Sequence, residues 1–292
     1  MSGDRRAIAF GLGAVALWST VATAFKFALA FMSPLELMWM AALVSWALMG
    51  ALVVHRGLGR VALASGWKTA AWAGLMNPVA YYLVLFAAYD RLPGQEAMAL
   101  NYTWALAMAF LAVPLLGQRL SRLDVLAGVM AYAGVWVIAT RGRVFDMAFE
   151  DPLGVVFALC STLIWALYWL LNARDAREPL VGQWQNFTIG LPVLTFLLLL
   201  GPGVTWHGWP ALGAGVYVGL FEMGIAFLLW QLAVNGISRT AKVSNLIFLS
   251  PPVSLMLLHF VMGEPLLIST FTGLGLILAG LALQQLPANQ KG

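Results

Sequence analysis

Two charged side chains lie inside long apolar segments, where their types could do chemistry. Glu222 lies in the apolar run 209–235, and Lys26 lies near the end of the run 7–30. A carboxyl group at membrane depth could bind a proton or a cationic amine, or it could form a bond inside a helical bundle. Lys26 could instead extend toward a membrane interface. If both face one cavity, they could recognise the amino and carboxylate groups of an amino acid.

Polar and aromatic residues recur at helical spacing in the same kind of segment. Thr23 and Lys26 share a helix face, as do Asn77 and Tyr81. Aromatic rings can stack on an aromatic solute and can attract an amino cation, although such rings also serve as packing or interface anchors. Asparagines can likewise bond neighbouring helices. The candidate substrate-binding residues are Trp18, Thr23, Lys26, Asn77, Tyr81, Tyr82, Phe86, Asn101, Trp165, Tyr168, Glu222, Ser244 and Asn245.

The composition indicates which solvent surrounds the elements that carry these residues. Of the 292 residues, 62% are hydrophobic and only 10% are charged, and the mean hydropathy is +0.86. A soluble domain carries roughly 25% charged residues, so this chain is expected in a lipid bilayer. The net charge of +4 is therefore interpreted as membrane orientation, with no nucleic-acid partner. With a single cysteine, Cys160, and three scattered histidines, we expect no metal or other cofactor.

The apolar segments predict ten membrane-spanning helices and no β-barrel pattern. A spanning helix needs about 20 mainly apolar residues and satisfies its own backbone hydrogen bonds in hydrocarbon. Charged, Gly and Pro clusters divide the chain into the runs 7–30, 34–54, 67–89, 95–116, 122–140, 152–173, 180–200, 209–235, 239–262 and 267–286.

Basic residues predict how these ten helices are oriented. One side of the membrane would hold only Arg91, Arg141 and Arg143 in its connections. The side of the N-terminus would hold Arg5, Arg6, Arg56, Arg60, Lys68, Arg119, Arg122, Arg174, Arg177, Arg239, Lys242 and Lys291. Because Lys and Arg accumulate in cytoplasmic loops, both termini are predicted to be cytoplasmic.

The chain also shows weak similarity to itself at a spacing near 145 residues. Gly74 and Gly219 are 145 apart, and the segments around Trp18 and Trp165 are similar at 147. We therefore expect two five-helix halves, residues 1–145 and 146–292. Five is an odd number, so equivalent loops must face opposite sides of the membrane, as the basic residues indicate. Inverted repeats of this kind are typical of secondary transporters, whose site lies between the halves.

Short motifs carry a resemblance to a known family. They are Trp18-Ser19 with its echo at Trp165, the Pro34-Leu35-Glu36 helix start, and the turns Gly117-Gln118-Arg119 and Gly263-Glu264-Pro265. The chain resembles the drug/metabolite transporter superfamily, specifically the ten-helix exporters with two EamA-type repeats, although that family usually has Trp-Gly where this chain has Trp18-Ser19. Asn77-Pro78, Tyr81-Tyr82 and the many tryptophans look most like a bacterial exporter of aromatic amino acids.

The resemblance implies an all-α membrane fold with two inverted repeats around a central cavity. The segments 122–140 and 267–286 would form a scaffold. The cavity would be lined by the segments 7–30, 67–89, 95–116, 152–173, 209–235 and 239–262. It implies alternating-access export of small amphipathic metabolites, aromatic and other amino acids first, across the bacterial inner membrane. Proton coupling stays open, with Glu222 as the candidate. The alternatives are a multidrug or lipophilic-cation exporter, a channel, and a membrane enzyme, for which no catalytic cluster is present in the sequence.

Overall fold

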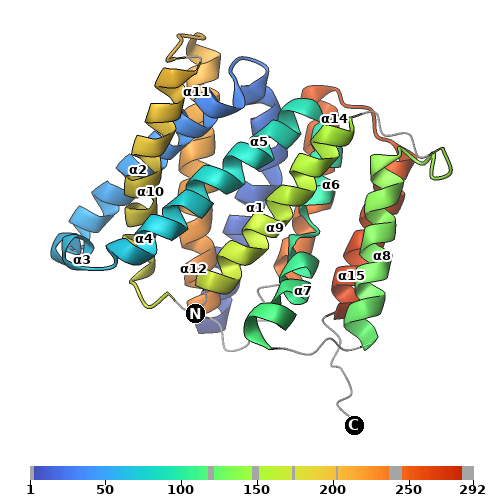
Figure 1. The fold of residues 1–292 in the computed structure, drawn as a ribbon, viewed down its shortest axis with the longest axis horizontal. Helices are drawn as coiled ribbons and strands as arrows, with labels where there is room; N and C mark the ends of the chain where they lie inside the picture. Colours follow the sequence, from blue (N-terminus) through green and yellow to red (C-terminus); the bar gives the residue numbers. More distant parts are fainter. Residues whose placement is uncertain are drawn as a thin grey trace.

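The computed structural model describes residues 3–117, 122–146, 151–172, 175–201, 203–236 and 245–284. Every regular element within these ranges is helical (Figure 1). They are α1 (Gly3–Leu29), α2 (Pro34–His55), α3 (Gly59–Ala64), α4 (Trp67–Gly74), η1 (Leu75–Ala80), α5 (Tyr81–Arg91), α6 (Gly94–Asn101), α7 (Trp104–Leu116), α8 (Arg122–Ala139), α9 (Pro152–Asn172), α10 (Pro179–Leu200), α11 (Trp209–Tyr217), η2 (Val218–Ile225), α12 (Ala226–Gly236), η3 (Asn245–Leu249), α14 (Ser250–Met262) and α15 (Ile268–Gln284).

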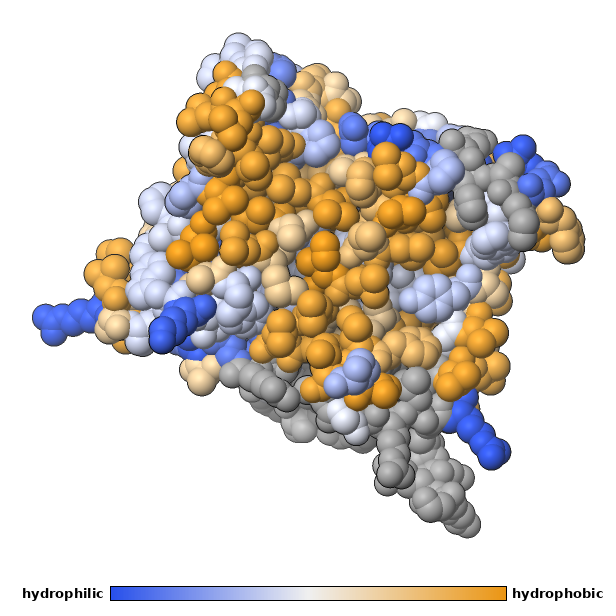
Figure 2. All heavy atoms as spheres, in the orientation of Figure 1, coloured by the Kyte–Doolittle hydropathy of each residue, from blue (hydrophilic) through white to orange (hydrophobic). Residues whose placement is uncertain are grey.

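Seven helical stretches are long and apolar enough to cross a membrane, judged by length and composition over the described residues. Three shorter apolar helices occupy Val125–Ala139, Ser250–Met262 and Ile268–Leu283. Large apolar side chains also cover the outside: Phe260 is 79% exposed and Ile268 is 84% exposed. Figure 2 shows one face that is mostly hydrophobic, with strongly hydrophilic residues near its margins. Such a surface is matched to lipid, so the prediction of an all-helical membrane protein is confirmed.

Two helices of similar design begin with side-chain caps. At the start of α2, the Ser33 hydroxyl accepts a bond from Glu36 N, and the Glu36 carboxylate accepts one from Ser33 N. At the start of α10, the Glu178 carboxylate accepts a bond from Val181 N at 2.8 Å. Each cap is followed by a proline in the first turn, where the missing N–H costs nothing. The two helices pack against each other.

The segment predicted as one helix over residues 67–89 contains a break. The chain runs from α4 through the π-helical η1 into α5, and Asn77 adopts a non-helical conformation with φ −141° and ψ 110° just before Pro78. A proline inside a helix removes a backbone donor and clashes with the preceding turn, which explains the position of the break. The equivalent stretch of the second half, η2, is also π-helical. By contrast, α10 continues through Pro192.

Glycines let helices of the two halves approach closely. A Cβ at Gly74 would collide with the carbonyl oxygen of Asn186 in α10, and a Cβ at Gly219 would lie 2.6 Å from the carbonyl oxygen of Ala41 in α2. Gly219 follows Gly74 by 145 positions, and Asn186 follows Ala41 by the same 145 positions. The two contacts are therefore equivalent under the internal repeat spacing.

A similar pair of contacts joins α8 and α15, which lie side by side at one edge of the bundle (Figure 1). A Cβ at Gly134 would collide with the Gly273 carbonyl, and a Cβ at Gly280 would lie 2.7 Å from the Ala127 carbonyl. Small residues at such crossings let backbones approach without side-chain clashes. Elsewhere α1 packs on α12 and α14, while α5 and α7 pack on α9. Helix α1 begins, and α15 ends, at the same end of the bundle (Figure 1).

Candidate functional site

Trp165 of α9 lies at the centre of an aromatic cluster between the two halves of the sequence. Its ring stacks on Tyr81 with 4.3 Å between centroids and an interplanar angle of 21°. It also stacks on Tyr168, one helical turn away, at 5.5 Å. Phe227 of α12 meets it edge-on at 5.8 Å. Only 8% of Trp165 is exposed, so the ring is a buried element of the bundle rather than an interface anchor.

The cluster extends to three further rings on α1 and α5. Tyr82 lies 4.8 Å from Tyr81 and 5.5 Å from Phe86, and Trp18 of α1 contacts Phe227 at 6.0 Å. We use "aromatic cluster" for Trp18, Tyr81, Tyr82, Phe86, Trp165, Tyr168 and Phe227. Six of these seven are candidates from the sequence, and the fold brings them together from segments that are up to 209 positions apart.

Glu222 reaches this cluster from η2. The Tyr82 hydroxyl donates a hydrogen bond to Glu222 Oε1 at 3.2 Å. The other carboxylate oxygen, Oε2, is buried and has no hydrogen-bond partner among the described residues. Because a buried polar atom without a partner costs free energy, this oxygen is suited to a ligand that donates a hydrogen bond.

Asn77 is the counterpart of Glu222 in the first half. The two residues are 145 positions apart, and each lies in a π-helical segment. Asn77 is 1% exposed, and in the part of the chain that the structure describes neither its side-chain oxygen nor its side-chain nitrogen has a hydrogen-bond partner. Since the Asn77 backbone is not helical, regular helical spacing does not determine which way its side chain points relative to Tyr81. An amide can donate to a carboxylate and accept from an amine.

Lys26 makes its contacts away from the carboxylate of Glu222. Its Nζ donates to the carbonyl oxygens of Tyr89 at 2.8 Å and Leu92 at 3.1 Å. These carbonyls belong to the end of α5, where a cation satisfies the last acceptors of a helix. The structure thus places Lys26 as a cap on α5. The sequence hypothesis that Lys26 and Glu222 recognise the two ends of an amino acid stays a prediction, although the Lys26 ammonium already has two backbone acceptors.

The remaining candidates have separate surroundings. Asn101 donates to Ser161 Oγ at 3.1 Å, which ties α6 to α9. The Thr23 hydroxyl is buried without a partner among the described residues. Ser244 lies outside the described residues, and the side chain of Asn245 is likewise outside them, so both stay predictions.

Two aromatic residues of α12 were missed by the sequence reasoning. Phe227 belongs to the cluster, and Trp230 lies 5.2 Å from Trp18 between ring centroids. A signal for Phe227 is present in the sequence, because it lies 145 positions after Tyr82. Applying the repeat spacing to each aromatic candidate would have found it.

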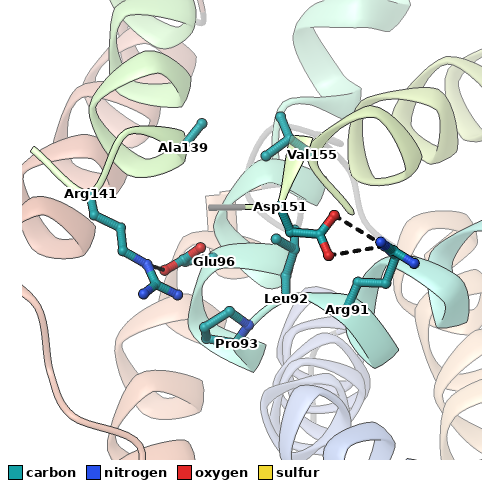
Figure 3. Close-up of a pocket in the computed structure, with 8 residues that line it drawn as sticks. All are labelled: Arg91, Leu92, Pro93, Glu96, Ala139, Arg141, Asp151 and Val155. Carbon is teal, nitrogen blue, oxygen red and sulfur yellow. Dashed lines mark hydrogen bonds and ion pairs between the residues drawn. The ribbon is translucent and has the colours of Figure 1, made fainter. Parts of the chain in front are cut away.

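Apart from the aromatic cluster, a hollow lies at the end of the bundle where α5 ends and α6 begins (Figure 3). It has a volume of about 240 Å³. Arg91 Nε lies 3.0 Å from Asp151 Oδ2, and Arg141 Nε lies 2.7 Å from Glu96 Oε1. The hydrogen bond from Gly154 N and the guanidinium of Arg91 lower the pKa of Asp151 below its ordinary value. Each arginine thus faces an acidic partner, so the charges of these four lining residues compensate one another.

A helical bundle with a lipid-matched surface and a buried aromatic and carboxylate site has the features of a membrane transporter. Comparison with known families gives the same class. The model of the EamA-like transporter family matches residues 5–140 and again residues 152–284. The chain therefore belongs to the EamA-like transporter family, within the drug/metabolite transporter superfamily, and is a membrane transporter.

Individual relatives are distant. An uncharacterized transporter of Bacillus subtilis, YvbV, is 24% identical over 278 residues, which are 92% of this chain and 88% of the relative. A probable terminal-alkyne amino-acid exporter of Streptantibioticus cattleyicolor is 26% identical over 203 residues, 66% of this chain and 65% of the exporter. One solved crystal structure aligns with a TM-score of 0.70 and 25% identity, covering 97% of each chain.

Proposed function

We propose that this transporter exports aromatic and related amino acids across the bacterial inner membrane by alternating access. The observation that carries the proposal is the unpartnered Glu222 Oε2 beside a buried aromatic cluster, judged over the described residues. Tyr81 and Trp165, which stack on each other in this structure, would separate to stack on an aromatic side chain, and Glu222 would offer an acceptor to an ammonium group. Asn77, whose two amide atoms have no partner in the described ranges, offers a donor to the carboxylate, the role first expected of Lys26. The exporter from Streptantibioticus cattleyicolor supports an amino-acid substrate.

The proposal includes ten membrane helices in two inverted repeats, residues 1–145 and 146–292, around a central cavity. The double match of the family model supports it. The reciprocal contacts of Gly74 and Gly219 support it too, because a two-fold relation between repeats makes each contact occur twice. The capped starts of α2 and α10, also 145 positions apart, agree with this relation. In this arrangement the three shorter apolar helices also span the membrane.

We further propose that both termini are cytoplasmic. The excess of Lys and Arg on that side supports this orientation, as does the position of the start of α1 and the end of α15 at one end of the bundle. The hollow with Arg91 and Arg141 then lies at the periplasmic end. Transport would be driven by gradients, since the sequence has no ATP-binding P-loop, and the protein would carry out no covalent chemistry.

One observation favours a second substrate class within the same fold. A carboxylate among aromatic rings also suits a lipophilic cation, which would need no partner for a carboxylate group. The two proposals therefore differ at Asn77. An amino-acid exporter uses its amide to bind the substrate carboxylate, while an exporter of lipophilic cations does not depend on it.

Uptake of labelled Trp, Phe and Tyr into proteoliposomes tests the proposal. We expect saturable uptake above that of protein-free vesicles. Unlabelled tryptophan should inhibit the uptake of labelled substrate more strongly than tryptamine, which lacks the carboxylate. It should also inhibit more strongly than indole-3-propionate, which lacks the amine. Replacing Asn77 with Ala should reduce the preference for tryptophan over tryptamine. Stronger competition by tetraphenylphosphonium than by any amino acid would favour the cation exporter, and unsaturable, ohmic flux would favour a channel.

A further inference from the structure

We propose that Glu264 is a gating residue, which locks one end of the transporter by capping the first turn of α6. The inference rests on the proposed alternating access, because a gate is needed only if the two ends open in turn. Glu264 follows α14 in the second half of the sequence, whereas α6 belongs to the first half. A contact between them therefore holds the halves together at this end.

The contact consists of three hydrogen bonds. Gly94 N donates to Glu264 Oε1 at 2.7 Å, and Gln95 N donates to Glu264 Oε2 at 3.2 Å. The Gln95 side-chain amide donates to the Pro265 carbonyl oxygen at 2.6 Å. Helix α6 has Pro93 at its N-cap position, and a proline side chain cannot cap a helix. Glu264 therefore supplies from the other half the acceptors that the first N–H groups of a helix require.

The junction around this contact is closely packed. A Cβ at Gly94 would lie 2.6 Å from Leu258 Cδ2 of α14 and 2.9 Å from Lys26 Cγ of α1. Gln95 is only 1% exposed. The Nδ1 atom of His259 lies 2.9 Å from the Glu264 carbonyl oxygen and so fixes the turn that carries Glu264. This end of the protein is thus closed where α1, α6 and α14 meet.

Two further polar contacts converge on the short link between α5 and α6. Lys26 binds the carbonyl oxygens at the end of α5, and Arg91 pairs with Asp151, which precedes α9 (Figure 3). The Arg91–Asp151 pair also joins the two halves of the sequence. The Arg141–Glu96 pair, in contrast, lies within the first half and need not break when the halves separate.

The chemistry of the lock suits repeated opening. Glu264 caps backbone N–H groups at a helix end, and it is only half-buried, so water can replace it when the contact breaks. A contact at this position costs less to open than an ion pair buried between the helices, where no water could replace the lost partner. Opening this end would therefore expose both the Glu264 carboxylate and the first N–H groups of α6 to water.

Reversible cross-linking tests whether this end must open. A variant with Gln95→Cys and Pro265→Cys, in a Cys160→Ala background, is joined by a bifunctional methanethiosulfonate reagent that a reductant cleaves. Cross-linking should abolish uptake, and the reductant should restore it. The matched control carries Glu96→Cys and Arg141→Cys, both in the first half, and should keep its uptake when cross-linked. Full uptake by the joined Gln95–Pro265 variant, with the link verified by mass spectrometry, would overturn the proposal.

Thiol labelling tests the lock without reference to any substrate. Ala97 of α6 is fully buried, so Ala97→Cys should react slowly with a membrane-impermeant maleimide. Adding Glu264→Ala should speed labelling roughly tenfold, the size expected for loss of a helix cap. Glu264→Gln, which keeps one acceptor, should have an intermediate effect. An unchanged labelling rate in a variant that elutes as a folded species would refute the gate, while failure of amino-acid uptake alone would refute only the proposed substrate.

Discussion

Tyr82 and Glu222 are joined by a hydrogen bond of 3.2 Å between a helix of the first half and the π-helical segment of the second. This bond lies inside the aromatic cluster and leaves one carboxylate oxygen without a partner among the described residues. In the proposed amino-acid exporter, this oxygen would accept from the substrate ammonium while Tyr82 keeps its bond to the other oxygen. Movement of one half against the other would alter this bond directly, so the proposed function would couple substrate binding and conformational change at one carboxylate.

The first prediction concerns the charge of Glu222. Glu222→Gln keeps the shape but removes the negative charge, so the apparent KM for tryptophan should rise at least about tenfold, as for loss of a charged hydrogen bond. Any pH dependence of uptake should also flatten if Glu222 carries the coupled proton. Initial uptake rates at several pH values measure both effects. Tyr82→Phe is the control, because it removes one hydrogen bond to Glu222 but keeps the negative charge of the carboxylate, so it should have a smaller effect. A Glu222→Gln variant with the wild-type KM and pH profile would remove Glu222 from the site.

The second prediction concerns the stacking surface. Trp165→Ala removes the ring that Tyr81 and Tyr168 stack on, whereas Trp165→Phe retains an aromatic face. A ring pair contributes about 0.5–1.5 kcal/mol beyond its burial, so the KM for aromatic substrates should rise several-fold in Trp165→Ala and less in Trp165→Phe. Trp209→Ala is the control because Trp209 is 76% exposed and lies outside the cluster. Equal uptake by all three variants would exclude Trp165 from substrate binding.

The third prediction concerns the crossing of α8 and α15. Gly280→Ala adds a methyl group whose carbon would lie 2.7 Å from the Ala127 carbonyl oxygen. Overpacking of this kind typically costs about 1–3 kcal/mol, so the melting temperature in detergent should fall. Gly275→Ala in the same helix is the matched control, because none of the described atoms outside its own helix lies within 4 Å of the added Cβ. The control should keep or raise the melting temperature, since alanine favours helix over glycine; equal melting of both variants would contradict the close approach.

The fourth prediction concerns Asp151 and acid. Its pKa is lowered by the hydrogen bond from Gly154 and by Arg91. A carboxyl group whose pKa is lower in the folded protein stabilises the fold above its ordinary pKa, about 3.9 for aspartate, and loses that contribution as pH falls through the folded value. Asp151→Asn should therefore lower the melting temperature at pH 7, with a difference that shrinks below about pH 4.

The control for Asp151 is Asp90→Asn. Asp90 is exposed and forms no ion pair with the described residues, so its replacement should have little effect at pH 7. A pH-independent difference between Asp151→Asn and the wild type would show that the helix cap alone, and not the ionised carboxylate, is stabilising.

Composition and periodicity alone determined much of this protein. Long apolar runs can satisfy their backbone only as helices in lipid, so the membrane fold followed from the sequence. Equivalent positions such as Gly74 and Gly219 were visible as a spacing, and aromatic candidates such as Trp165 were visible as deep rings in apolar segments. These properties depend on residue types along the chain, which a sequence displays directly.

Tertiary structure decided which candidates meet. From the sequence, Lys26 and Glu222 were candidates to recognise the two ends of an amino acid, yet Lys26 caps α5 while Glu222 binds Tyr82. The break at Asn77 disrupts the regular helical phase on which the face assignment depended. The contact of Glu264 with α6 was invisible because it joins residues 170 positions apart and involves backbone N–H groups, which every sequence contains. Which carboxylate reaches which partner depends on how helices cross, and helix crossing is set by packing across the whole bundle.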